Sequence, residues 1–334
     1  MFKRVFPLLL VFLLGCDQPI GEDYVARLER VLGHDAPLLV ENHALTFPAP
    51  RQLPGPENGA VLSVREFLSL RGCRLHSVLA QRNSQMGKLA TQSQRLFNDL
   101  EILATGPECV AQLKNQTLAT KLSELITIKQ AQLPHQLAHA LLHQDENRAF
   151  WQANNRTSVH VYPPAQKSIE YLTQFSHEVL TGRTSFSDAE RNRIERHLGE
   201  LRFGQGGNAL IESNQIVHAL ARADALIDLR LAQPLCFNAQ ATPSARHFQN
   251  VVTKVFIQQV QPSSIRLQRF DQALLQDYNQ FEDLLLPFAA LPYQHWAQQR
   301  RQRMQQRRQA PAQHVARVQQ LFLQCGLTVG GSKT

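Results

Sequence analysis

Apolar residues recur along most of the chain with the spacing of one helix face. Between residues 74 and 104 they alternate at four-residue and three-residue intervals, which predicts one long amphipathic helix ending at Gly106-Pro107. Two polar residues, Arg82 and Ser93, interrupt this apolar face. A second clear stripe runs from Leu267 to Leu285. These patterns favour helix over strand throughout the body of the protein.

The remaining segments also favour helix, since they contain no run of strand-like segments in which apolar and polar residues alternate. We therefore expect an all-α protein, an elongated multi-helix bundle of mostly antiparallel helices. Pro134 is expected to interrupt or kink the helix that contains it, and residues 154–164 to form an extended connection. The other expected helices cover residues 20–32, 110–143, 165–181, 187–202, 208–232, 243–261, 263–286, 293–308 and 311–325.

The positions of prolines and glycines suggest how the chain is divided into segments. Residues 45–60 carry four prolines and two glycines, which predicts a semi-rigid extended connection. We assign residues 16–62 to a lipid anchor and proline-rich tether. Residues 63–334 form the helical body, with possible halves at 63–153 and 165–334.

The N-terminus has the pattern of a targeting signal. Lys3 and Arg4 precede an apolar run at residues 5–14. Ten helical residues rise about 15 Å, whereas a bilayer core is about 30 Å thick, so this run is too short to span. Residues 1–15 are therefore expected to be a cleavable signal peptide. The end of the run, Leu13-Leu14-Gly15-Cys16, resembles the bacterial lipobox, in which the cysteine receives the lipid.

This resemblance predicts lipidation of Cys16, and the alternative is a secreted protein with an incidental cysteine. Several acyl chains would hold the protein on a bilayer far longer than one chain. Asp17 follows the cysteine and resembles the signal that retains lipoproteins in the inner membrane. We expect the periplasmic face of the inner membrane, with the outer membrane as the alternative.

The net charge of the chain favours some classes of binding partner over others. The chain has a formal net charge of +8, with 43% hydrophobic and 19% charged residues. A basic protein outside the cytoplasm is expected to meet anionic lipid, a cell-wall polymer or an acidic envelope protein rather than nucleic acid.

Once Cys16 is assigned to lipid, four cysteines remain, at positions 73, 109, 236 and 325. An even number in an oxidising compartment predicts two disulfides, and four cysteines allow three pairings. We favour Cys73–Cys109 and Cys236–Cys325, because each would close one helical segment onto itself. The first pair requires the chain to double back as a helical hairpin or a packed loop.

A polar group within the first apolar face is one candidate site. Arg82 occupies an apolar-face position and needs a partner if buried. Asn83, Ser84 and Lys88 could extend an anion or substrate pocket around it. The alternative is a structural arginine paired with a carboxylate or a helix C-terminus.

Three histidines form a second candidate. His135, His139 and His143 follow one another at four-residue spacing, so they share a helix face and could chelate zinc or copper with His160 or Glu146. The alternative is a row of surface histidines, which we favour because Leu137 and Leu141 lie on a different face.

A cluster of arginines near the C-terminus is the third candidate. It could be a solvated helix surface or a basic patch for anionic lipid or an acidic partner. Its members are Arg300, Arg301, Arg303, Arg307 and Arg308.

The stretch FLSLRGCRLHSVLAQRNSQMGKLATQSQRL, residues 67–96, resembles the signature of an uncharacterised family of proteobacterial lipoproteins, domain of unknown function 3080. The lipobox cysteine, the RNS-x-x-GK segment, Cys109 and the overall length contribute to this resemblance. It implies an envelope compartment and a helical body, but no reaction.

The sequence contains no nucleotide-binding loop, nucleophile elbow or HExxH motif. We therefore expect a membrane-anchored periplasmic lipoprotein that acts as a non-enzymatic binding or scaffolding component of the envelope, without a cofactor. The alternative is an envelope enzyme or metal-binding protein that uses the Arg82 pocket or the histidine row.

Overall fold

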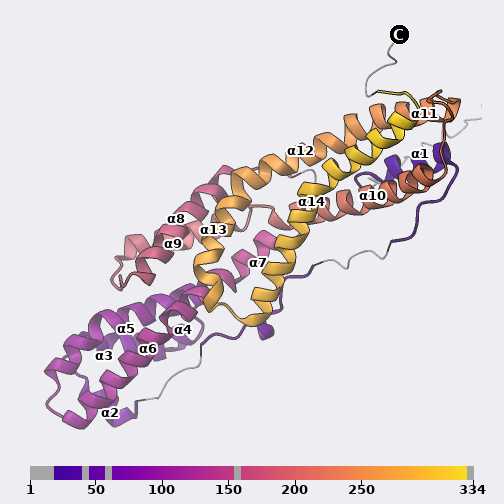
Figure 1. The fold of residues 1–334 in the computed structure, drawn as a ribbon. Helices are drawn as coiled ribbons and strands as arrows, with labels where there is room; N and C mark the ends of the chain where they lie inside the picture. Colours follow the sequence, from indigo (N-terminus) through magenta and orange to yellow (C-terminus); the bar gives the residue numbers. More distant parts are fainter. Residues whose placement is uncertain (1–18, 40–44, 57–61, 154–158, 329–334) are drawn as a thin grey trace, which may run out of the picture. The chain divides into compact units, whose positions relative to one another are not determined.

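The computed structural model describes residues 19–39, 45–56, 62–153 and 159–328 (Figure 1). Within these ranges the protein is all-α, and the only β interaction is an isolated bridge between Phe237 and Gln240. Both favoured disulfides, Cys73–Cys109 and Cys236–Cys325, are present. The predicted fold class is confirmed.

The helices of the first half are α1 (Glu22–Leu32), α2 (Val64–Ser69), α3 (Arg74–Asn83), α4 (Gln85–Lys88), α5 (Gln92–Gln112), α6 (Gln116–Leu142), α7 (Asp145–Trp151) and α8 (Pro163–Leu180). The second half contains α9 (Asp188–Leu201), α10 (Gly206–Ala232), α11 (Pro243–Val251), α12 (Gln261–Phe270), α13 (Gln276–Leu285) and α14 (Leu291–Gln324). Two π-helical stretches, Val252–Val260 and Asp271–Leu275, connect α11, α12 and α13 without a break.

The chain forms two compact units. Of the described residues, unit 1 comprises 19–39, 215–261 and 312–328, and unit 2 comprises those between 45 and 214 and between 262 and 311. The division falls within α10, α12 and α14 rather than at residues 154–164, so it differs from the expected halves 63–153 and 165–334. The reason is that single long helices contribute turns to both units.

The first helix is part of the core of unit 1. Tyr24, Val25, Leu28 and Leu32 of α1 have no exposed surface, and the helix packs against α11 and the π-helical stretch after it. Gly21, with φ of 90°, begins the helix where an added Cβ would lie 2.6 Å from the Ala219 Cβ. Residues 22–32 therefore do not belong to the tether expected over residues 16–62.

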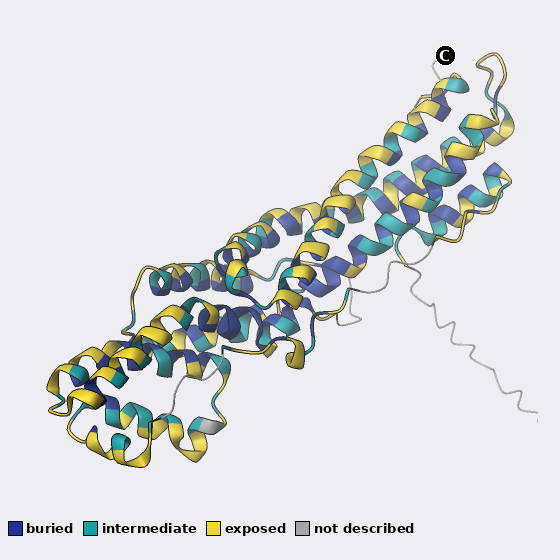
Figure 2. Ribbon diagram, turned by 60° about the horizontal axis from the view of Figure 1, so that its bottom comes forward, coloured by how far each residue is buried: buried dark blue, intermediate teal, exposed yellow. Residues whose placement is uncertain are grey.

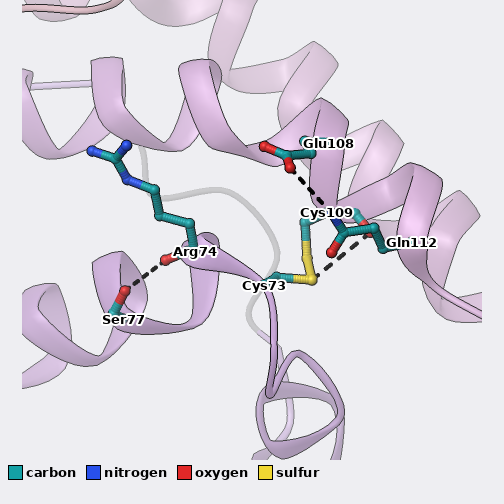
Figure 3. Close-up of a disulfide and its surroundings, with 6 residues drawn as sticks. All are labelled: Cys73, Arg74, Ser77, Glu108, Cys109 and Gln112. Carbon is teal, nitrogen blue, oxygen red and sulfur yellow. Dashed lines mark hydrogen bonds between the residues drawn. A yellow bond between two sulfur atoms is a disulfide. The ribbon is translucent and has the colours of Figure 1, made fainter.

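A helical hairpin in unit 2 explains the first disulfide. α5 and α6 pack side by side, and α3 packs against α5 (Figure 1). Cys73 caps the N-terminus of α3 and Cys109 lies in the last turns of α5, with a Cα–Cα distance of 5.3 Å (Figure 3). The chain doubles back between them, as the predicted pairing requires.

The predicted helix 74–104 is instead divided. Ser84 accepts a hydrogen bond from the Gly87 amide and starts α4, and Thr91 forms a capping box with Gln94 that starts α5. These side chains offer the backbone an alternative to continuing the helix. Met86 and Leu89 of the expected apolar face are consequently exposed.

Prolines, in contrast, do not end helices here. Pro107, Pro134 and Pro311 lie inside α5, α6 and α14, and the chain stays helical through Pro262. Each proline removes one backbone hydrogen bond. Around Pro107 and Pro134 the neighbouring turns bury apolar side chains, which compensates for that loss.

The second apolar stripe is confirmed. Its six members are at most 1% exposed. They are Leu267, Phe270, Leu274, Tyr278, Phe281 and Leu285. α13, which carries three of them, packs against α8 and α6. Figure 2 shows that buried and exposed positions alternate around the helices.

Candidate functional site

A cavity of about 690 Å³ lies in unit 2, between α3, α5, α6 and the segment that precedes α2. Leu53, Gly55, Pro56 and Leu62 of that segment line one side of it. This volume falls within the range of small-molecule binding sites.

One end of the cavity is apolar. Leu75 and Leu79 of α3, Ile102 of α5, and Leu122 and Ile126 of α6 line it. They belong to, or pack against, the apolar cluster beside the Cys73–Cys109 disulfide. Since that bridge joins α3 to α5, it holds the walls of this end together.

The other end is polar and cationic. Lys129 Nζ lies 2.7 Å from Asp99 Oδ1, and Arg82 Nη1 lies 3.9 Å from the same oxygen. Arg95 lines this end as well and bonds the carbonyl of Ala90 through its Nε at 3.2 Å. Asp99 thus has two of these three cations as ion-pair partners.

The register of the helices explains why one end of the cavity is apolar and the other is polar. α5 places Gln92, Arg95, Asp99 and Ile102 along one face, at successive spacings of three and four residues. α6 runs back along α5 after a short loop, so its polar cavity residues lie beside the polar ones of α5. Along α3 the cavity lining likewise changes from apolar at Leu75 to cationic at Arg82.

The structure places two residues of the predicted Arg82 pocket at this cavity. Arg82, Asn83 and Gly87 line the cavity. Ser84 instead caps α4 and donates to the carbonyl of Gln81 at 2.7 Å, which is a structural role. The side chain of Lys88 lies outside the described residues.

Sequence reasoning did not identify Arg95, Asp99 and Lys129. Arg95 and Asp99 directly precede Leu96 and Leu100, two buried members of the predicted apolar face. Charged residues beside an apolar face are usually solvent-exposed, so no signal in the sequence set these two apart.

The histidine row does not lie on the surface as expected. His139 and His143 are buried, with their Nδ1 atoms 3.2 Å apart, whereas His135 is exposed and its Nδ1 lies 3.0 Å from the carbonyl oxygen of Phe288. His143 is covered by the chain that leads into α14: the backbone amide of Ala290 donates to His143 Nε2, and the Tyr293 ring centre lies 5.4 Å from the His143 ring centre. Gly55 lies beside the His139 ring.

Burial keeps both inner histidines neutral. It lowers the pKa of His143 to about 3, with the neighbouring His139 as the second cause. Burial, and then the charge of Arg95, lowers the pKa of His139. His139 also lines the polar end of the cavity. Within the described residues, no group of three or more His, Cys, Asp or Glu side chains is arranged to hold a metal ion.

The arginine cluster is not an exposed basic patch. Arg300 and Arg307 are 1% and 2% exposed. Arg300 donates to both oxygens of Glu282, at 3.0 and 2.6 Å, and Arg307 bonds closely with Asp271. The expectation failed because the acidic partners lie some 18 to 36 positions earlier, on the helices that pack against α14.

The other arginines of the cluster are similarly engaged or half-buried. Arg301 donates to Glu282 and Asp283, and Arg308 donates to Asp271. Arg303 is half-buried. The cluster therefore ties α14 to α13 and to the π-helical stretch before it.

A buried hydrogen-bond network surrounds the Glu282 carboxylate. Tyr293 donates to Glu282 at 2.7 Å, and Tyr278 donates to Asn147 at 2.6 Å. Burial alone would raise the pKa of Glu282, but Arg300 and Arg301 outweigh it and hold that pKa below its ordinary value. Since these groups are sealed from solvent, the network stabilises the core and offers no access to a substrate.

The proposed anchor residues Cys16 and Asp17 lie outside the described residues. No helix within the described ranges has both the length and the apolar character needed to cross a bilayer.

Comparison with known families gives one result. A family described as "Protein of unknown function (DUF3080)" matches residues 21–329. Neither the curated proteins nor the solved structures compared with the chain give a match. Because the matched segment covers nearly all of the sequence, this chain belongs to the DUF3080 family.

Proposed function

We propose that this protein is a membrane-anchored lipoprotein of the bacterial envelope that binds a ligand and does not catalyse a reaction. The N-terminal run ending in Leu-Gly-Cys16 supports the anchor, because it is too short to span a bilayer and ends in the acceptor cysteine. The two disulfides suit an oxidising compartment such as the periplasm.

The cavity in unit 2 is the observation that carries the binding role. It combines an apolar wall with a small number of polar groups at one end, which is the usual composition of a ligand site. Its described lining contains no serine, threonine, cysteine or tyrosine. The histidine there is held in its neutral form, and the carboxylate of Asp99 is ion-paired.

Asp17 supports the periplasmic face of the inner membrane as the location, with the outer membrane as the alternative. Anionic lipid, a cell-wall polymer or an envelope protein are the classes of partner that the positive charge favours.

Intact mass spectrometry of the protein purified from its membrane tests the anchor. The mature chain is expected to begin at Cys16 and to carry a diacylglycerol adduct, and a Cys16→Ser variant should keep the precursor mass. Membrane fractionation then tests sorting: wild type is expected in the inner membrane, and Asp17→Ser in the outer. An unacylated mature chain would refute the proposal.

A crosslinking pull-down from solubilised membranes tests the binding role. A lipid, polymer or protein recovered with wild type should be lost with Leu79→Trp, which fills the apolar end of the cavity. Recovery that does not depend on the cavity would show that binding, if any, occurs elsewhere.

A further inference from the structure

We infer that Leu38 and Leu39 form a second membrane contact, in which both side chains insert into the surface of the bilayer that holds the lipidated Cys16. These two leucines lie at the edge of unit 1 where the N-terminal segment enters it. The inference rests on the proposed lipid anchor and adds which edge of unit 1 lies against the membrane.

The anchor cannot lie far from unit 1. The backbone amide of Glu22 donates to the carbonyl of Pro19 at 3.1 Å, which ties Pro19 to the first turn of α1. Three peptide units join Cys16 to Pro19, so their Cα atoms are at most about 11 Å apart in any conformation. The lipidated sulfur lies at the level of the head groups, a layer about 5–8 Å thick on each side of a bilayer. Pro19 is therefore held at or close to the membrane surface.

The first helix starts at this edge of unit 1 and leads away from the anchor, alongside α10 and in the same direction. At its start, a Cβ added to Gly21 would lie 2.6 Å from the Ala219 Cβ. At its end, Arg230 Nε donates to the carbonyl of Leu32 at 2.8 Å. The 11 residues of α1 rise about 16 Å. The chain must therefore reverse after Leu32 if a later residue is to lie near the anchor.

The segment after α1 makes this reversal. The amide of Ala36 donates to Glu29 Oε1 at 3.0 Å. Further on, the carbonyl oxygen of Leu39 lies 3.4 Å from His218 Nε2. The other nitrogen of this imidazole, Nδ1, lies 3.9 Å from Glu22 Oε1. Leu39 and Glu22 thus meet at one histidine ring, so the returning chain brings Leu39 back to the start of α1.

The two leucines present apolar surface at this edge. Leu38 is 96% exposed and Leu39 is 39% exposed. A single exposed leucine is common on protein surfaces, but these two are adjacent and lie at the anchored edge. Side chains of this kind enter a bilayer surface to a depth of about 5–10 Å. Insertion would remove them from water, which is favourable in proportion to the apolar area that is buried.

The charges beside the leucines are already compensated within unit 1. Arg222 Nη1 lies 2.7 Å from Glu22 Oε2, and Arg27 Nε lies 2.9 Å from Asp23 Oδ2. These carboxylates therefore do not oppose the approach of a bilayer as unpaired charges would. The contact depends on the burial of the leucines, so a zwitterionic bilayer is sufficient to test it.

The test uses the full lipidated chain in nanodiscs of zwitterionic lipid, with or without bromine near the head-group end of the acyl chains. Bromine quenches indole fluorescence only at close range. Leu38→Trp adds an indole at the exposed position, whereas Trp151 and Trp296 are 5% and 4% exposed and provide a wild-type background for subtraction. The added emission is expected to be strongly quenched in the brominated discs.

Leu323→Trp is the matched control. Leu323 is 76% exposed and also belongs to unit 1. Gln324 Nε2 lies 3.4 Å from the carbonyl oxygen of Leu231, which places the end of α14 about 18 Å along α10 from Ala219. The emission added by Leu323→Trp should therefore be the same in brominated and plain discs.

A second measurement does not depend on an added tryptophan. Leu38→Asn combined with Leu39→Asn should speed transfer of the lipidated protein from discs to acceptor vesicles by roughly tenfold or more, because the burial of two leucines is lost. Leu323→Asn should leave the transfer rate unchanged. Equal melting temperatures of the variants and wild type would confirm that the fold is retained.

Several outcomes would overturn the inference. Equal quenching in Leu38→Trp and Leu323→Trp, or an unchanged transfer rate in the double variant, would contradict a specific contact of Leu38 and Leu39 with lipid. Protection of the Leu38→Trp indole from acrylamide in native membranes, without quenching in the discs, would identify a protein as the occupant instead. The mass of the Cys16 fragment is measured in the same discs. Absence of quenching with an intact anchor contradicts only this inference, whereas a missing anchor contradicts the proposed function.

Discussion

Arg300 and Glu282 form a two-point ion pair from which solvent is excluded, with 1% and 0% of their side chains exposed. The guanidinium also lies 4.2 Å from the centre of the Trp151 ring. α14 and α13 are thereby held in one register, because a shift of either helix would leave a charge buried without its partner.

Removing one member of this pair should be strongly destabilising. Glu282→Gln or Arg300→Met is expected to lower the free energy of unfolding by about 3–5 kcal/mol, measured by urea denaturation. Arg183→Gln, which breaks exposed ion pairs with Glu178 and Glu190, should have a much smaller effect. Similar losses in the buried and exposed variants would show that the Arg300 pair does not govern the stability of unit 2.

Mild acid should destabilise unit 2 through its buried histidines. The unfolded state protonates His143 near its ordinary pKa of 6.5, whereas the folded state does so only near about 3. The unfolded state therefore binds more protons between these values. Stability present above pH 6.5 should fall as the pH is lowered, by about 2–3 kcal/mol between pH 6.5 and 4.5.

The matched variant is His143→Gln, which removes the titrating group. Its free energy of unfolding should depend less on pH than that of wild type over the same interval. Glu66 and Glu190, with pKa values lowered from 4.5 to about 2, lose their contribution mainly below this interval. An unchanged pH slope in the variant would exclude His143 as the source.

Gly87 should tolerate no side chain. An added Cβ would lie 2.3 Å from the carbonyl oxygen of Arg82 and 2.4 Å from that of Gln81, so Gly87→Ala must displace the α3–α4 turn. We expect a loss of more than about 1 kcal/mol in unfolding free energy. Gly199→Ala is the control, because no atom lies within 4 Å of its Cβ position inside α9. It should stabilise by about 0.5–1 kcal/mol, and a loss there would point to a general intolerance of substitution.

The two disulfides should stabilise separate parts of the protein. They close loops of 36 and 89 residues, which correspond to about 4 and about 4.6 kcal/mol of lost chain entropy in the unfolded state. Cys73→Ser with Cys109→Ser should speed amide hydrogen exchange in unit 2. Cys236→Ser with Cys325→Ser should do so in unit 1. Equal effects on both units would contradict this separation.

The stability of unit 1 should depend on the hydrogen bond between Tyr24 of α1 and His314. The hydroxyl lies 2.8 Å from His314 Nε2, whose ring is oriented by Asp224 at 2.6 Å from Nδ1. Tyr24→Phe leaves that buried nitrogen without a donor, so we expect a loss of about 1–3 kcal/mol in unit 1. Both variants are compared with wild type by thermal denaturation. Tyr162→Phe, which removes a surface hydrogen bond to Glu200, is the control and should leave the melting temperature nearly unchanged.

Helical periodicity predicted the fold well where apolar spacing alone determined it. The stripe from Leu267 to Leu285 follows from one helix face. The pairing of Cys73 with Cys109 follows from one helical hairpin. Prediction failed at Ser84 and Thr91, because capping side chains competed with a strong apolar pattern. It also failed at Pro107, where packing outweighed one lost hydrogen bond.

The site was harder to predict, because its residues meet only through tertiary contacts. Arg82 was found as a polar interruption of an apolar face, but Lys129 comes from a helix further along the chain. The arginines at 300 and 307 were misassigned because a sequence shows their charges and not the carboxylates that neutralise them.

The Tyr24–His314 contact joins positions 290 residues apart, and unit 1 is built from the beginning, the middle and the end of the chain. Such a unit cannot complete its packing until the part of α14 that carries His314 has been synthesised. Until α11 and the π-helical stretch after it have been made, the apolar face of α1 stays uncovered, open to proteases and to aggregation. α1 therefore waits through most of the synthesis of the chain for its packing partners.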